Sequence, residues 1–123
     1  MDDIIKQERH KLHMAADNIS QMLQVIEDKD ESHFFWAWMQ MESNLNAARQ
    51  CFIGSSKEFC DKIENIFKKH QNTLDKRDEI HQKLMDNPKM DALTDEDLKE
   101  ISKGLKSLLK DLYEMFGLEE FQE

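Results

Sequence analysis

The sequence predicts an all-α protein, an antiparallel up-and-down bundle of about four helices. Three glycines and one proline among 123 residues leave few positions for tight turns. Valine and tyrosine each occur once, so residues that favour β-strands are scarce. Apolar residues recur every three or four positions along four segments. This length suits a single domain spanning residues 1–123.

The first predicted helix covers about residues 2–27. Four apolar residues follow one another at intervals of seven: Ile5, Leu12, Ile19 and Ile26. Such spacing gives one apolar seam that faces other helices. The acidic cluster of residues 28–31 breaks the pattern, and Asp30 and Ser32 are both candidate N-caps for the next helix.

The second predicted helix, about residues 32–53, is the least charged part of the chain, with only Glu42 and Arg49 charged. Six residues form its heptad seam: Phe34, Trp38, Met41, Leu45, Ala48 and Phe52. Four residues near its start form the candidate partner-binding site: His33, Phe35, Trp36 and Met39. One seam cannot bury all the apolar residues here. The helix is therefore either a central element covered on both flanks or a surface that docks a partner.

The third predicted helix covers about residues 55–86 and follows a short connection at Gly54, with a capping box from Ser55 to Glu58. Its seam contains five apolar residues: Phe59, Ile63, Ile66, Ile80 and Leu84. Three polar residues occupy the middle of that seam: His70, Thr73 and Arg77. We expect Phe67 and Leu74 to supply the packing there and the polar residues to reach solvent. The alternative is an internal polar site that sets helix register.

The fourth predicted helix covers about residues 94–116 and follows a stop at Pro88. Thr94 is its expected N-cap, with Asp97 at N3. Leu93 and Leu98 form a hydrophobic staple around it. Its seam contains six residues: Leu98, Ile101, Leu105, Leu108, Leu112 and Met115. Gly117 fits a helix end, and residues 117–123 are expected to be a loosely ordered tail.

A second architecture fits the same pattern. An uninterrupted third helix would span roughly 47 Å at 1.5 Å per residue, which is long for a compact bundle of this size. The alternative is an extended helical hairpin that completes its core by dimerisation.

The chain carries a net charge of −9, from 26 acidic and 17 basic residues. A protein that binds nucleic acid directly would need the opposite sign, so none is expected as a partner. The start Met1-Asp2-Asp3 opens no signal peptide, and no apolar run is long enough for a membrane span. We therefore expect a cytoplasmic protein without a membrane partner. Cys51 and Cys60 are expected to be free thiols that face opposite sides of a helix pair, with a redox switch as the alternative.

Residues that bind metals or catalyse reactions do not form a convincing set. His10 and His13 lie with Asp17 on one helical face, opposite the apolar seam. Two Asp-x-x-His pairs, at residues 30–33 and 78–81, lack the glutamates of carboxylate-bridged iron sites. The isolated glycines form no phosphate-binding loop. We expect no metal, no cofactor and no enzymatic activity.

The sequence therefore favours a non-enzymatic protein–protein interaction module, such as an adaptor, chaperone, inhibitor or assembly subunit. Its aromatic and methionine-rich helix would bind a protein partner, and a homodimer is one form of that contact. The alternative function is an acidic nucleic-acid mimic that inhibits a DNA- or RNA-binding protein. The dependence of partner binding on salt distinguishes the two functions, because binding by a mimic weakens steeply as the ionic strength rises.

Overall fold

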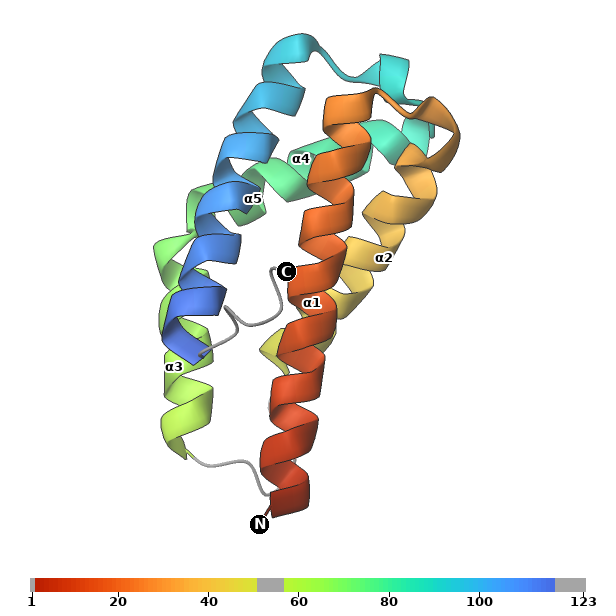
Figure 1. The fold of residues 1–123 in the computed structure, drawn as a ribbon. Helices are drawn as coiled ribbons and strands as arrows, with labels where there is room; N and C mark the ends of the chain where they lie inside the picture. The colour runs from red at the N-terminus through yellow and green to blue at the C-terminus, as the bar shows by residue number, and fades with distance from the viewer. Residues whose placement is uncertain (1, 51–56, 117–123) are drawn as a thin grey trace.

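The computed structural model describes residues 2–50 and 57–116, with side chains for residues 12–50 and 57–114. Five α-helices and one short 3-10 helix make up the described elements, and no strand occurs among these residues. The all-α expectation is confirmed (Figure 1). The elements are α1 (Asp2–Asp28), α2 (Glu31–Arg49), α3 (Lys57–Lys69), α4 (Gln71–Asp86), η1 (Met90–Ala92) and α5 (Asp95–Phe116).

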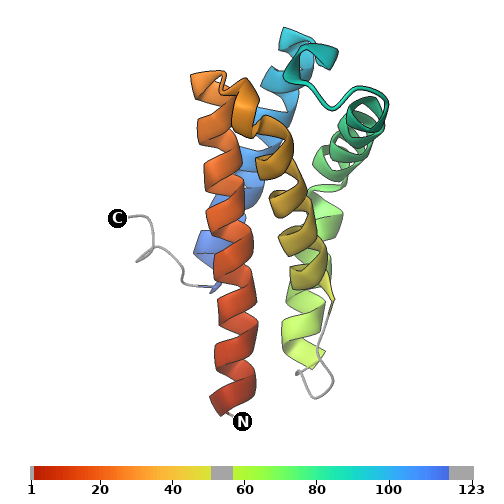
Figure 2. The same ribbon diagram turned by 90° about the vertical axis from the view of Figure 1, so that its right-hand side faces the viewer.

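The helices lie around one core. Helix α1 packs against α2 on one side and α5 on the other, and both run in the direction opposite to α1 (Figure 1). Helix α3 runs up beside the lower part of α5, and α4 then crosses obliquely behind α5 and α1 (Figure 1). Viewed from the side, α4 closes the upper part of the molecule opposite α1 (Figure 2). Helix α4 therefore covers α5 without continuing the line of α3.

The prediction of a single third helix over residues 55–86 is wrong, because the chain turns at His70. The backbone there has φ −103° and ψ 25°, away from helical values. The His70 N–H still donates to the Ile66 carbonyl, and the Leu74 N–H donates to the His70 carbonyl, both at 3.1 Å. The bend divides a segment that, as one straight helix over residues 55–86, would be too long for a compact bundle of this size.

Of the polar residues in the third segment, His70 is buried and Thr73 and Arg77 are half-buried, so the expectation that these residues reach solvent is wrong for His70. His70 is buried, with 6% of its surface exposed, and its Nε2 lies 2.6 Å from Asp111 Oδ2 on α5. Thr73 packs so closely against Gly104 of α5 that a Cβ at Gly104 would collide with its side chain. Only 13% of the Arg77 side chain is exposed. Tilting α4 over α5 turns these residues inward, while Phe67 and Leu74 are buried as expected.

The predicted seams account for most of the core. The buried residues that were expected from heptad spacing lie on every α-helix: Leu12, Ile19, Phe34, Trp38, Met41, Leu45, Ala48, Ile63, Ile66, Ile80, Leu84, Ile101, Leu105, Leu108 and Leu112. Helix α2 ends at Arg49 and not at residue 53, because Gln50 is already extended. Residues 51–53, the capping box at Ser55 and the tail 117–123 lie outside the described residues. No helix in the described ranges has a stretch that is both long and apolar enough to cross a bilayer.

The predicted boundary at Thr94 is confirmed and forms a buried polar cluster. The Thr94 N–H donates to Asp97 Oδ2 at 3.1 Å, and the Asp97 N–H donates to Thr94 Oγ1 at 3.0 Å. Lys76 and Lys83 of α4 also donate to the Asp97 carboxylate, at 2.7 and 2.8 Å. Burial alone would raise the pKa of Asp97, but these hydrogen bonds outweigh it and hold the pKa far below its ordinary value. The cluster fixes the start of α5 on α4.

Cys60 on α3 is in a disulfide, so the expectation of a free thiol is wrong for this residue. That expectation assigned both cysteines to helical positions on opposite sides of a helix pair. Helix α2 ends at Arg49, and Gln50 is already extended. Cys51 itself lies outside the described residues.

Candidate protein-binding surface

Helix α2 divides its aromatic residues between two faces. Its inward face buries six residues: Phe34, Ala37, Trp38, Met41, Leu45 and Ala48. The rings of Phe34 and Trp38 stack with their centroids 6.3 Å apart. Trp38 is 0% exposed, so this ring belongs to the core. The helix is therefore a central element on this face.

The outward face of α2 holds the large apolar residues that the seam cannot bury. Trp36 is 61% exposed and Met39 is 38% exposed. Residues three positions apart lie on the same side of a helix, so these two side chains leave α2 together. Phe35 is half-buried and packs against the core. The structure thus brings Trp36 and Met39 to one surface and uses Phe35 mainly to hold the helix.

Polar contacts on one flank attach α2 to the helices beside it. Glu42 Oε1 lies 2.7 Å from His81 Nδ1 on α4. The Arg49 guanidinium lies 5.2 Å from the centre of the Phe67 ring on α3 and contacts Glu64 at 3.4 Å. Burial on one side and these contacts on another leave α2 little freedom to rotate. Trp36 therefore stays at the surface.

His33, the fourth predicted site residue, belongs to a small polar cluster at the start of α2. Its Nδ1 lies 2.7 Å from Asp30 Oδ2, and Ser32 Oγ donates to Asp30 Oδ1 at 2.8 Å. The hydrogen bonds from Ser32 and His33 lower the pKa of Asp30. Asp30 occupies the N-cap position but makes no capping hydrogen bond with its side chain. The cluster keeps a carboxylate ionised at the edge of the exposed surface.

Met85 of α4 is an exposed apolar residue that the sequence did not single out. Met85 is 48% exposed and lies one turn after His81 on the same side of α4. Glu42 contacts His81, and Asn46 accepts a hydrogen bond from Arg77 at 3.4 Å, so α2 and α4 run antiparallel here. Met39 and Met85 therefore both lie one turn beyond the same ion pair. Finding Met85 required the register of the two helices, which no local pattern gives.

The residues of the two Asp-x-x-His pairs have other partners. Asp30 and His33 pair with each other at the start of α2, whereas His81 pairs with Glu42. Asp78 accepts a hydrogen bond from Arg77. Within residues 2–50 and 57–116, no three His, Cys, Asp or Glu residues are arranged to hold a metal ion.

Comparison of the chain with protein-family models, with curated proteins and with solved structures yields no match.

Proposed function

We propose that this chain is a protein–protein interaction module that binds its partner through the outward face of α2. Trp36 and Met39 would make the main contacts, with Phe35 and His33 at the edges. The observation that carries the proposal is the exposure of Trp36, at 61%, on a helix fixed by its neighbours. Tryptophan contributes a large area at little cost in conformational entropy, and it is enriched among residues that dominate binding.

The charges around the surface indicate the chemistry of the partner. Asp28, Asp30 and Glu31 surround the start of α2, with Lys29 as the one base in this stretch. A partner segment with apolar side chains flanked by lysine or arginine would complement this arrangement. The acidic residues would steer the encounter, and the apolar contact would supply most of the affinity.

The partner contact can be tested with two double variants. Trp36→Ala/Met39→Ser removes the apolar surface, whereas Ser20→Ala/Ser107→Ala changes exposed polar residues of α1 and α5, outside this surface, and serves as the control. Tagged proteins capture partners from the native host, and quantitative mass spectrometry compares them at low and moderate salt. We expect a partner that is retained by the native chain and the control and lost by the first variant.

The fold of the first variant must be intact for this loss to be informative. Exposed residues make little packing contact. We therefore expect the free energy of unfolding of Trp36→Ala to stay within about 0.5 kcal/mol of that of the native chain. A partner that binds the Trp36→Ala/Met39→Ser variant as strongly as the native chain would contradict the proposal.

Self-association is one form of the same contact, because a second copy would present the same surface. Light scattering of the native chain and of Trp36→Ala/Met39→Ser distinguishes this form. A dimer that becomes a monomer in the variant identifies the second copy as the partner.

We also propose that the chain is a single cytoplasmic domain. Its helices α1, α2, α3 and α5 would form an up-and-down bundle, and α4 would pack across this bundle at an angle.

The acidic mimic remains the second candidate, but the structure offers it less support. Mimicry needs rows of free carboxylates. Several acids of α5 are instead neutralised by lysines of neighbouring helices. Asp97 binds Lys76 and Lys83, and Asp111 binds Lys69 at 2.9 Å. We therefore favour apolar docking, and we propose no catalytic role for the chain.

A further inference from the structure

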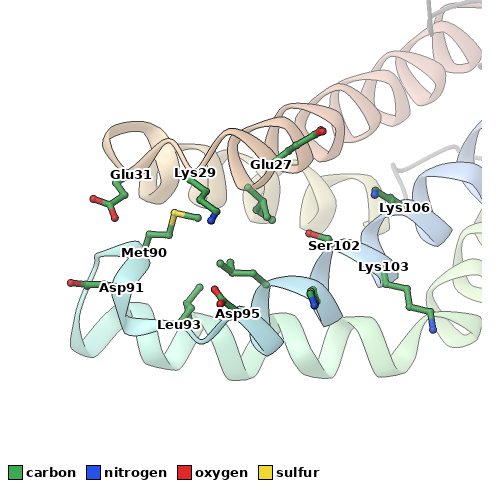
Figure 3. A pocket seen from close by; sticks show the side chains of 13 residues that line it. Glu27, Lys29, Glu31, Met90, Asp91, Leu93, Asp95, Ser102, Lys103 and Lys106 are labelled. Carbon is green, nitrogen blue, oxygen red and sulfur yellow. The ribbon is translucent and has the colours of Figure 1, made fainter.

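A groove lies at the end of the molecule where α1 passes into α2 and η1 leads into α5. Its volume is about 760 Å³, within the range of small-molecule sites. Four apolar residues form its floor: Ile26, Met90, Leu93 and Leu98. The α1–α2 turn places Lys29 over this floor, because Lys29 adopts a positive φ of 54° (Figure 3). The outward face of α2 contributes none of the four site residues to this groove.

The charged residues of the groove are distributed along its length. Glu31 and Asp91 lie at one end, and Lys103 and Lys106 lie with Ser102 at the other, with Glu27, Lys29 and Asp95 between the two ends (Figure 3). Lys99 and Lys106 are seven positions apart on α5, so they lie on the same side of that helix. The groove thus combines apolar residues with four acids and four lysines, and two of the lysines lie at the end away from Glu31 and Asp91.

The lysines of the groove differ from most other lysines of the described chain. Four line it: Lys29, Lys99, Lys103 and Lys106. None of these four forms an ion pair with a described residue. Elsewhere, Lys57, Lys62, Lys69, Lys76 and Lys83 are each within 3.3 Å of an acid. In a chain with net charge −9, a group of lysines without acidic partners is available to an anionic ligand.

We propose that this groove binds a free, single-chain amphiphilic anion, such as a medium-chain fatty acid. The alkyl chain would lie on Leu98 and Ile26 and point toward Met90. The carboxylate would lie near Lys99 and Lys106, away from Glu31 and Asp91. Lys106 lies eight positions after Leu98, about 12 Å along the helix at 1.5 Å per residue, which suits an alkyl chain of medium length.

Isothermal titration calorimetry with dodecanoate, kept below its micelle concentration, tests the proposal. We expect saturable binding of one molecule per native chain. Lys99→Gln/Lys106→Gln should weaken that binding about tenfold or more, because charge-assisted hydrogen bonds are lost. Lys68→Gln/Lys110→Gln makes the same change in net charge outside the groove, and its binding should equal that of the native chain. All these lysines are exposed, so both variants should fold.

Two further ligands separate the contributions of charge and chain. Dodecyltrimethylammonium carries the same alkyl chain with a positive head, and we expect no saturable binding of it at the same concentration. Acetate carries the carboxylate alone, and it should not bind either. The proposal is overturned if dodecanoate does not bind, if the two lysine pairs have equal effects, or if the cationic ligand binds as tightly as dodecanoate.

Discussion

The start of α5 and the start of α2 use similar residues with different results. Each start has an acid and a hydroxyl residue positioned to cap a helix. At α5, Asp97 caps the helix and binds two lysines of α4, and it is only 5% exposed. At α2, Asp30 bonds only the side chains of Ser32 and His33 close to the surface. The surroundings of each acid therefore decide its role, whatever the local motif.

The difference separates a structural region from a surface available for binding. Every side-chain hydrogen bond at Asp97 comes from within the fold, so this carboxylate fixes the start of α5 in place. The start of α2 satisfies its polar groups locally and leaves Trp36 and Met39 unburied. Stability should therefore depend strongly on the first region and weakly on the second.

The largest expected effect is that of Asp97→Asn on stability. The substitution removes a buried charge and leaves Lys76, whose side chain is 11% exposed, without its closest partner. We expect the free energy of unfolding to fall by about 2–3 kcal/mol, since Glu79 and Glu100 compensate in part. Urea denaturation measures this loss. The matched substitution Asp30→Asn should leave the denaturation midpoint nearly unchanged, and equal losses in the two variants would erase the distinction between the regions.

Acid should weaken the same region selectively. The pKa of Asp97 is lowered from an ordinary value of 3.8, so the folded state holds this carboxylate ionised in acid more strongly than the unfolded chain does. Its stabilising contribution is complete above 3.8 and declines as the pH falls from there toward the lowered pKa. The native chain also loses a contribution from Asp111, whose pKa is lowered by Lys69, despite burial, and by His70.

Urea denaturation of the native chain and of Asp97→Asn over a range of acidic pH isolates the contribution of Asp97. We expect the difference in unfolding free energy to shrink as the pH falls below 3.8. A difference that stays constant into strong acid would show that Asp97 stabilises the fold by packing and not by charge.

Because burial repeats with the period of the helix, heptad spacing predicted the helical segments and most of the core, but not the division of the third segment into α3 and α4. It identified Phe34 and Trp38 as core residues, and the staple motif located the boundary at Thr94. It also showed that α2 has more apolar residues than one seam can bury. The spacing does not specify which neighbours cover a helix, so the exposure of Trp36 required the structure.

The bend at His70 was missed because no glycine or proline marks it. The available signal was the run of polar residues in the seam, His70, Thr73 and Arg77, which indicated that this segment does not pack as a straight helix. The partners of Asp97 were missed for a related reason. Lys76 and Lys83 reach Asp97 only because α4 tilts over α5, and the tilt depends on the bend.

The smallest expected effect compares substitutions to alanine in the α4–α5 contact and on the outward face of α2. Gly104→Ala should raise helix propensity by about 1 kcal/mol, yet the new Cβ would collide with Thr73 where α5 meets α4. We expect a net destabilisation of about 1 kcal/mol, because α4 is fixed by Asp97 and cannot move away freely. Ser43→Ala on the outward face of α2 gains propensity without any such contact, so it should stabilise the chain by about 0.5 kcal/mol.

Thr73→Ala provides the control for this pair, because it removes the atoms nearest to the new methyl group. In the Thr73→Ala background, Gly104→Ala should become neutral or stabilising, as Ser43→Ala is in the native chain. Thermal or urea unfolding of the native chain, Gly104→Ala, Thr73→Ala and the double variant gives the interaction energy between positions 73 and 104. If Gly104→Ala stabilises the native chain as Ser43→Ala does, α4 moves away freely, and Asp97 does not fix α4 rigidly against α5.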